Sequence, residues 1–173
     1  MANVPAEEKL LRTKMPTFDF SKHDAKEIRD LLTHMKRTMH AAHGIGLSAN
    51  QIGLKLRVFI GQVPDANGAL KFYAIFNPEI EKTIGEKTPF EEGCLSVPGT
   101  YGETMRPETV VLKGFDKRGK PVKIKAWGLL AKMFQHEVDH LNGVLFIDKA
   151  KGLHYEDPEA RRSAAERWKE DHP

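Results

Sequence analysis

The sequence predicts an α+β fold in which a mixed, mostly antiparallel sheet surrounds a central helix, with further helices near each end of the chain. The chain has 173 residues, a length that suits one domain. One helical pattern comes first, several strand-like runs follow, and two helical patterns come last. This order is typical of α+β proteins and argues against a doubly wound parallel sheet. We therefore take residues 1–173 as one domain, with residues 148–173 as a C-terminal tail and short helix.

The first helix is predicted to run from about Ser21 to His43, and Gly44 is placed to end it. Apolar residues recur along it at the spacing of one helix face. They are Ile28, Leu31, Leu32, Met35 and Met39. The pattern predicts an amphipathic helix with one apolar stripe.

Short strands are predicted to follow. The strand-like runs are residues 57–60, 72–76, 109–115 and 121–126. The pair Asn77-Pro78 is expected to end the second run. Asp116-Lys117-Arg118-Gly119 separates the last two runs and predicts a hairpin turn.

Two helices are predicted in the last third of the chain. One runs from about Gly128 to Asn142-Gly143, where glycine can supply the C-terminal cap. The other is short and charged, from Pro158 to about Lys169, because proline suits the first turn of a helix.

The composition favours a soluble protein and excludes some classes of partner. Hydrophobic residues make up 40% of the chain and charged residues 29%. The formal net charge of +3, from 27 basic and 24 acidic residues, is too even to predict DNA binding. A polyanion such as ribosomal RNA could still be attracted. No apolar run approaches the roughly 20 residues of a membrane helix, and residues 1–14 show no secretory signal.

The chain has a single cysteine, Cys94, so it forms no internal disulfide. A lone cysteine fits a reducing, intracellular setting, and we expect the protein in the cytoplasm. Taken alone, such a cysteine is usually a small buried apolar residue.

The strongest local signal is the segment His136-Glu137-Val138-Asp139-His140, an H-E-x-x-H pattern inside the predicted helix at 128–142. Residues four apart lie nearly above one another on a helix, so both imidazoles can bind one ion. Glu137 then lies beside the ion, free to move protons. Two histidines by chance on a helix surface are the alternative. The apolar side of this helix favours a buried site: Leu129, Leu130, Met133, Phe134, Val138 and Leu141.

A catalytic metal typically has three protein ligands and one open position, so a third ligand is needed. Cys94 and several carboxylates are candidates. Cys94 lies in residues 91–98, which show little helix or strand periodicity, and Gly93 allows the backbone to approach closely. A thiolate is a good ligand for zinc or ferrous iron.

A third segment, residues 44–51, contains two glycines after the first helix. A plain loop is the default interpretation. The glycines could instead cradle the backbone of a ligand, but no Gly-Lys-Ser/Thr follows, so this is not a phosphate loop. The amide of Gln51 is a potential oxyanion donor.

These three segments, in this order, resemble the signature motifs of the peptide deformylase family. The family patterns are G-x-G-L-A/S-A-x-Q, E-G-C-L-S and Q-H-E-x-D-H. Here they correspond to Gly44–Gln51, Glu92–Ser96 and Gln135–His140. The resemblance covers about residues 10–148, and three ordered motifs are far more specific than one.

The resemblance implies a metal-dependent hydrolase that removes formate from the N-formylmethionine of newly synthesised polypeptides. It implies one Fe²⁺ per chain, which Zn²⁺, Ni²⁺ or Co²⁺ can replace. It assigns the metal to Cys94, His136 and His140. It makes Glu137 the catalytic carboxylate and gives the oxyanion to Gln51 and the backbone N–H of Leu95. We expect a monomer. In bacterial relatives a C-terminal helix docks on the ribosome, but this tail is short, so the resemblance gives only weak support for such a contact here.

The substrate is expected to contact a pocket that the same motifs and the central helix line. Its predicted residues are Gly44, Ile45, Gly46, Glu92, Gly93, Leu129, Lys132 and Met133. Lys132 stands where relatives are often apolar. Either its ammonium reaches water, or it pairs with Glu92 and narrows the pocket. Tyr101 stands where many bacterial relatives carry Arg, which puts one contact with the substrate backbone in question.

Two other classes of metal protein must be weighed. Metallopeptidases share H-E-x-x-H and commonly take a further His or Glu ligand downstream, where only His154 and Glu156 follow closely. That choice leaves Cys94 unexplained. A structural zinc site needs four protein ligands, and only three are found.

Overall fold

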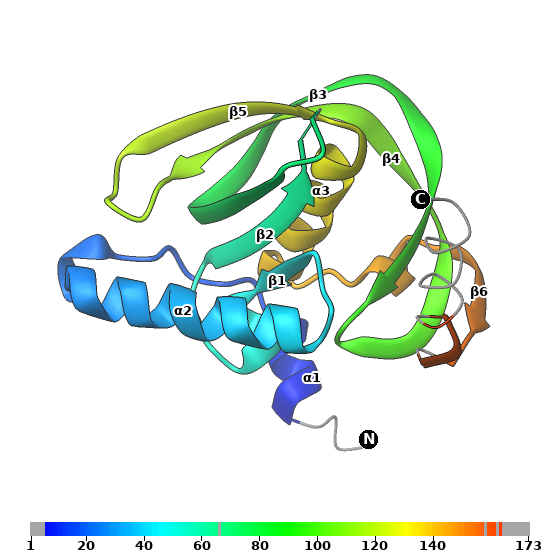
Figure 1. Cartoon of the computed structure of the whole chain (residues 1–173), viewed down its shortest axis with the longest axis horizontal. Coiled ribbons are helices and arrows are strands. Elements are labelled where there is room, and N and C mark those ends of the chain that lie inside the picture. The colour runs from blue at the N-terminus through cyan, green and yellow to red at the C-terminus, as the bar shows by residue number, and fades with distance from the viewer. Residues whose placement is uncertain (1–5, 66, 158, 162, 164–173) are drawn as a thin grey trace.

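The computed structural model of the chain describes residues 6–65, 67–157, 159–161 and 163. Its sheet has six antiparallel strands in the order β1-β2-β3-β4-β5, and β6 pairs with β4 (Figure 1). The strands are β1 (Gly46–Ser48), β2 (Val58–Pro64), β3 (Leu70–Cys94), β4 (Val97–Phe115), β5 (Pro121–Trp127) and β6 (Lys151–Tyr155). The helices are α1 (Ala6–Leu11), α2 (Ala25–Ala41) and α3 (Gly128–Leu141), with short 3₁₀ turns η1 (Phe20–Lys22), η2 (Ala49–Ile52) and η3 (Phe146–Asp148). The predicted α+β class and antiparallel sheet are confirmed.

Strand β2 separates two hydrophobic cores because successive side chains of a strand point to opposite faces. Val58 and Ile60 pack with the buried stripe of α2, whereas Phe59 packs with α3. Its ring lies 5.6 Å from that of Phe134. The two helices therefore cover opposite faces of the sheet, and α3 is enclosed by the curved strands (Figure 1).

Helix α2 starts four residues later than predicted, since Asp24 and not Ser21 precedes its first turn. The Asp24 carboxylate accepts hydrogen bonds from the backbone N–H groups of Lys26 and Glu27, and the Glu27 carboxylate accepts from the Asp24 N–H. This capping box satisfies backbone donors that a helix start leaves unpaired. The buried side of α2 holds Ile28, Leu32, Met35 and Met39, as the apolar spacing predicted.

The prediction that Asn77-Pro78 ends a strand was wrong. Strand β3 continues to Cys94, with shifts in its register against β4 between Phe76 and Glu79 and at three later points. Asn77 adopts a positive φ of 49° and exchanges two hydrogen bonds with the backbone of Phe18. The Asn-Pro pair therefore marks an irregularity that bends the strand. The bent β3–β4 ribbon arches over α3 and returns its far end to that helix (Figure 1).

Helix α3 keeps the predicted bounds and is buried on most of its surface. Its side chains contact β1, β2, β4 and β5. Gly143 follows the helix with a positive φ of 76°, and a Cβ there would lie 2.6 Å from the backbone oxygen of Arg12. Enclosure on several sides holds the residues of α3 in fixed positions relative to the sheet.

The C-terminal part contains a strand that sequence patterning missed. Strand β6 pairs with β4, with Tyr155 opposite Thr100 and His154 opposite Tyr101. The helix predicted for residues 158–169 lies mostly outside the described residues, of which 159–161 and 163 are helical. No helix in the described part of the chain is long and apolar enough to cross a membrane.

Candidate metal centre and substrate pocket

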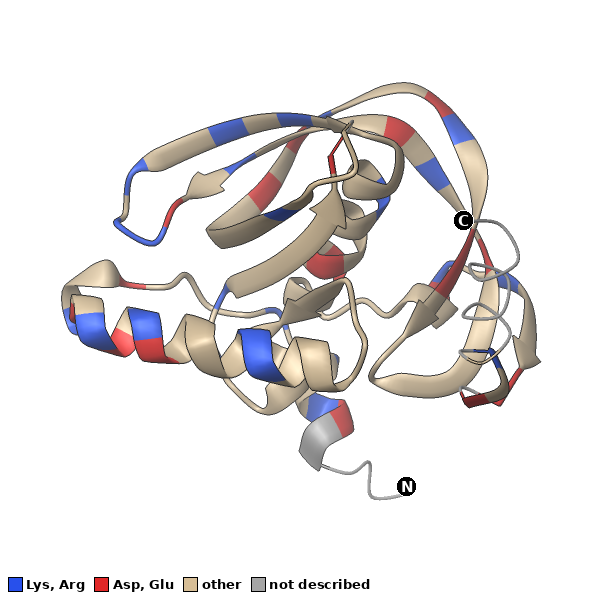
Figure 2. Cartoon of the chain, in the orientation of Figure 1, with Lys and Arg blue, Asp and Glu red and all other residues tan. Residues whose placement is uncertain are grey.

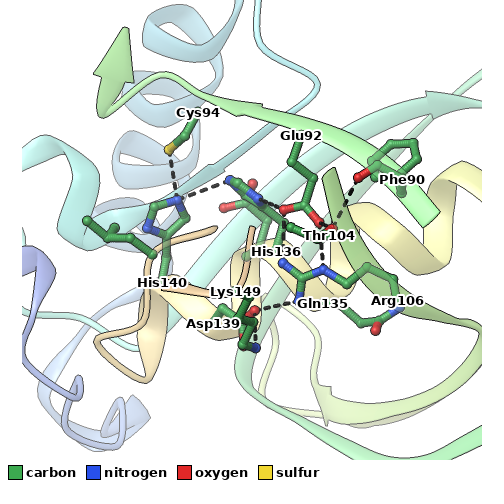
Figure 3. A network of polar contacts seen from close by, with 12 residues as sticks. Phe90, Glu92, Cys94, Thr104, Arg106, Gln135, His136, Asp139, His140 and Lys149 are labelled. Atoms are coloured by element: carbon green, nitrogen blue, oxygen red, sulfur yellow. Dashed lines mark hydrogen bonds and ion pairs between the residues drawn. The ribbon is translucent and has the colours of Figure 1, made fainter. Parts of the chain in front are cut away.

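Helix α3 and the end of β3 bring three potential metal ligands together (Figure 3). The Nε2 atoms of His136 and His140 lie 3.1 Å apart, as residues one helical turn apart can. The Cys94 Sγ lies 3.1 Å from the His140 Nε2. All three donor atoms fall within 4.8 Å of one another, although Cys94 is more than 40 positions away in the sequence.

Cys94 reaches the histidines because the β3–β4 connection turns sharply beside them. Cys94 pairs with Val97, which leaves Leu95 and Ser96 as a two-residue turn. The Ser96 N–H lies 3.4 Å from the Cys94 sulfur. Residues 91–98 show little strand periodicity in the sequence, yet residues 91–94 belong to strand β3, which ends at Cys94.

The arrangement fits a four-coordinate ion with one open position. With bonds of 2.0–2.3 Å, donors in a tetrahedral zinc or iron site lie roughly 3.3–3.6 Å apart, close to the separations found here. Burial lowers the pKa of His140 to about 3, which favours a neutral ring. Burial disfavours the charged form of His136 too, but hydrogen bonds with Cys94 and Glu92 outweigh it and raise the pKa of His136 to about 10, so an ion must displace a proton there. Among the described residues this group has three members, and a closed structural site would need four.

A buried network of charges holds the ring of His136 (Figure 3). The His136 Nδ1 lies 2.9 Å from the Glu92 carboxylate, which leaves Nε2 to face Cys94 and His140. Arg106 donates two hydrogen bonds to the same carboxylate, at 2.6 and 2.9 Å, and Thr104 donates another. Carboxylates that hold the second ring nitrogen of a ligand histidine fix its orientation and raise its basicity.

The network extends from Glu92 to the protein surface. Arg106 also pairs with Asp139, whose carboxylate receives the ammonium of Lys149 at 2.7 Å. Burial raises the pKa of Glu92, but hydrogen bonds from Arg106 and His136 outweigh it and hold the pKa well below its ordinary value. Glu92 is therefore an anion whose charge the buried guanidinium balances.

Glu137 is held in one position by two residues of β1. The Ser48 hydroxyl donates to the Glu137 Oε2 at 2.6 Å. A Cβ on Gly46 would lie 2.3 Å from the other carboxylate oxygen, so only glycine leaves room for it. Burial raises the pKa of Glu137, which favours a group that can take up and release a proton.

Gln51 presents its amide donor to the metal centre. Its Oε1 accepts from the Ser48 N–H at 2.8 Å, which fixes which way the amide points. The Nε2 then lies 3.1 Å from the Ser96 Oγ and 3.7 Å from the Cys94 Sγ. The amide N–H groups therefore point toward the turn that carries Cys94.

The predicted site residues surround one cavity of about 710 Å³. It is lined by thirteen of the fourteen candidates: Gly44, Ile45, Gly46, Gln51, Glu92, Gly93, Cys94, Leu95, Leu129, Lys132, Met133, His136 and Glu137. The remaining one, His140, is buried in contact with Cys94 and His136. Apolar rim residues are exposed, with 45% for Ile45, 39% for Leu95 and 41% for Leu129. The size and apolar walls suit a small linear ligand.

Both alternatives stated for Lys132 were wrong. Its ammonium neither reaches water nor pairs with Glu92, because the residue is buried and its Nζ donates to the Thr88 Oγ1 and the Arg106 backbone oxygen. Burial lowers the pKa of Lys132. The carboxylate of Glu92 is already occupied by Arg106, so Lys132 ties α3 to the β3–β4 ribbon instead.

Sequence reasoning missed four residues that shape the site. Arg106 and Thr104 hold Glu92, Ser48 holds Glu137, and Arg161 lines the cavity. The Arg161 guanidinium stacks 4.0 Å from the ring centre of Tyr101 and pairs with Glu91 and Glu156. Ser48 lies inside a recognised motif and could have been found. The other three depend on strand register and on contacts between distant segments.

Comparison with known proteins agrees with this geometry. Residues 3–156 match the family described as Polypeptide deformylase. A peptide deformylase of Halothermothrix orenii is 46% identical over 124 residues, which cover 72% of this chain and 78% of that protein. One from a Picosynechococcus species is 43% identical over 125 residues, covering 72% of this chain and 67% of the relative.

Two solved structures are also similar. A peptide deformylase from Synechococcus elongatus in complex with actinonin has a TM-score of 0.75 and 36% identity, covering 83% of this chain and 75% of that chain. A probable peptide deformylase from Synechococcus phage S-SSM7 has a TM-score of 0.74 and 38% identity, covering 82% and 93%.

Proposed function

The chain belongs to the polypeptide deformylase family, whose members carry out metal-dependent deformylation of nascent peptides, and we propose how its own residues perform that reaction. In this proposal Cys94, His136 and His140 hold one divalent ion at the end of the cavity. The convergence of these three donors beside a buried carboxylate is the observation that carries the proposal.

The bound ion supplies Lewis-acid chemistry, which polarises a carbonyl and makes water a stronger nucleophile near neutral pH. Other residues of the chain orient the three side chains that bind the ion. Glu92 holds the His136 ring so that Nε2 faces the ion, and Arg106 keeps Glu92 charged and in place. The Cys94 thiolate comes from a turn whose position depends on the pairing of β3 with β4.

Glu137 moves the protons. Its Oε2 is fixed by Ser48 and its Oε1 lies in the space that Gly46 leaves open. We assign Glu137 to take a proton from the attacking water and to deliver it to the nitrogen of the leaving amine. Its raised pKa fits a group that must hold the proton between these two steps.

Gln51 and the backbone N–H of Leu95 stabilise the negative charge that grows on the formyl oxygen. The amide of Gln51 is oriented in advance by the Ser48 N–H. Donors placed before the reaction stabilise the transition state without a cost of reorganisation. Both donors belong to segments that border Cys94, so the oxyanion forms beside the ligand sulfur.

The cavity receives the first side chain of the peptide. Gly44, Gly46 and Gly93 allow the peptide backbone to approach, and Ile45, Leu129 and Met133 supply apolar contact. The stem of Lys132 contributes apolar surface, since its ammonium is bonded on the far side to Thr88 and Arg106. An unbranched apolar side chain such as methionine fits these walls.

Fe²⁺ is the proposed ion, with Zn²⁺, Ni²⁺ and Co²⁺ as substitutes, because a mixed sulfur and nitrogen donor set suits each of them. We propose N-formylmethionyl nascent peptides as substrates, action as a monomer, and the cytoplasm as the location, which fits the single unpaired cysteine. We also propose that the C-terminal segment contacts the ribosome.

The test is formate release from formyl-Met-Ala-Ser by protein purified without oxygen, with metal content measured in parallel. We expect about one ion per chain, and rapid release from the formylated peptide but no cleavage of the unformylated one. Glu137→Gln should retain the ion and lose at least 10³-fold in kcat, within the range of general acid–base catalysis combined with lost orientation. Cleavage of the free peptide, or full activity of the Glu137 variant, would overturn the assignment.

A further inference from the structure

A second cavity lies away from the metal centre, between α2 and the turn that joins β4 to β5. We call it the α2–hairpin groove. It has a volume of about 610 Å³ and is lined by Arg29, Leu32, Thr33, Lys36, Phe72, Ala74, Asp116, Lys117 and Arg118. None of these residues lines the metal cavity.

Positive charge dominates this groove. Its four basic side chains are exposed, and none of them forms an ion pair with a carboxylate of the described residues: Arg29, Lys36, Lys117 and Arg118. Figure 2 shows blue segments, beside red ones, on α2 and blue segments at the turn between β4 and β5, on the same side of the molecule. A groove lined by four basic side chains and one carboxylate attracts an anion.

The nearby carboxylates take part in other contacts, and Asp116, the one that lines the groove, offsets only part of its positive charge. The Asp116 Oδ1 accepts the backbone N–H groups of Arg118 and Lys120, which shapes the hairpin turn. On α2, Asp30 pairs with Lys26 at 2.6 Å, and Glu27 caps the helix start. The free positive charge is therefore a property of the groove rather than of the chain, whose net charge is only +3.

The groove also holds an aromatic ring. Phe72 is 36% exposed, and the Lys36 ammonium lies 5.0 Å from its ring centre. Cations that track a backbone beside an aromatic ring are the combination that binds single-stranded nucleic acid. Four cations arranged over two elements also suit an extended polyanion better than one small anion.

We propose that the α2–hairpin groove binds the phosphate backbone of single-stranded RNA. Four phosphate contacts predict that the logarithm of the binding constant falls with the logarithm of salt concentration with a slope of about −3. The metal cavity begins where α2 ends, since Ala42 and His43, the two residues that follow this helix, line the cavity. Lys36 lies six residues before Ala42, which is about 9 Å along the helix axis. RNA bound in the groove would therefore lie close to the mouth of the metal cavity.

The test uses a fluorescein-labelled 16-nucleotide RNA and measures anisotropy at 50 and 200 mM KCl. We expect wild-type protein to bind about fifty-fold more weakly at the higher salt concentration, as the slope requires. A variant with Arg29→Gln, Lys36→Gln, Lys117→Gln and Arg118→Gln should bind at least tenfold more weakly at 50 mM and lose most of the salt dependence.

A matched control removes the same amount of charge elsewhere. Lys55→Gln, Lys82→Gln, Lys125→Gln and Lys151→Gln replace four exposed lysines that do not line the groove. This control should keep most of the binding, and circular dichroism should show both variants folded. Arg29→Lys with Arg118→Lys keeps the charge and should keep the salt slope.

Three outcomes would overturn the proposal. One is absence of RNA binding by the wild type. Another is equal loss in the groove and control variants, which would mean that net charge alone acts. The third is binding of polyglutamate or of anionic lipid vesicles with the same affinity as RNA and with the same loss in the groove variant. That result would mean that RNA is not the preferred partner. Formate release from the formylated peptide, without RNA, is measured separately, so failure here leaves the proposed reaction untouched.

Discussion

At the scale of single residues, the position of Glu137 depends on the absence of a side chain at Gly46. An added Cβ would lie 2.3 Å from the Glu137 Oε1, far closer than non-bonded atoms allow, so the carboxylate would have to move. We expect Gly46→Ala to lower kcat at least tenfold with unchanged metal content, because misplacement of a catalytic group by about 1 Å is costly. A control, Gly85→Ala, meets nothing within 4 Å; its positive φ of 81° should lower stability, but kcat should stay unchanged because Gly85 lies away from the site.

Substitution of Ser48 gives a second test of how the Glu137 carboxylate is positioned. Ser48→Ala removes a buried 2.6 Å hydrogen bond to Glu137, and hydrogen bonds to charged groups contribute roughly 1.5–3 kcal/mol. We expect kcat to fall about tenfold or more while the metal content stays the same, and Ser48→Thr to restore part of the rate. Unchanged steady-state kinetics in Ser48→Ala would show that Ser48 does not position the carboxylate.

At the scale of elements, the ion network of Glu92, Arg106 and Asp139 fastens the β3–β4 ribbon to α3. Arg106 has only 4% of its side chain exposed, and its loss would leave the Glu92 carboxylate buried without a counter-charge. Removal of one partner from a buried pair typically costs about 3–5 kcal/mol of stability. We therefore expect Arg106→Met to unfold at a much lower urea concentration than the wild type.

Lys113→Met supplies the matched control for this prediction. Lys113 lies on the same strand as Arg106 and forms an ion pair with Glu79 of β3, but both side chains are about half exposed. Exposed pairs contribute little to stability, so the urea midpoint should hardly move. Equal effects of the two substitutions would mean that the buried network does not fasten the ribbon to the helix.

At the scale of the whole molecule, the metal ion joins parts of the fold that are distant in the sequence. Cys94 ends a 25-residue strand, whereas His136 and His140 lie on the central helix. A ligand that binds only the folded state stabilises it in proportion to the logarithm of its concentration over its dissociation constant. We expect a chelator to lower the melting temperature by several degrees and added metal to restore it. An unchanged melting temperature would show that the ion does not join these segments.

Contacts between residues that are close in the sequence could be predicted, whereas contacts between distant segments could not. Helical spacing predicted α2 and α3, and the H-E-x-x-H pattern predicted that His136 and His140 meet, because these contacts are local. The long β3–β4 ribbon was missed, since Asn77-Pro78 is usually a stop signal and the bend that it makes depends on contacts with Phe18. Arg106 was missed for the same reason, because only the pairing of β3 with β4 brings its side chain to Glu92, although its partner in the register is Thr88. The assignment of one domain stays a prediction.

The central claim is that one thiolate and two imidazoles from separate parts of the chain hold a single ion. X-ray absorption spectroscopy at the edge of the bound metal, on protein purified without oxygen, tests it most directly. We expect a first coordination shell with one sulfur atom at about 2.3 Å, two nitrogen atoms at about 2.0–2.1 Å and one oxygen atom. A first shell of nitrogen and oxygen without sulfur would contradict it, because Cys94 would then not bind the metal.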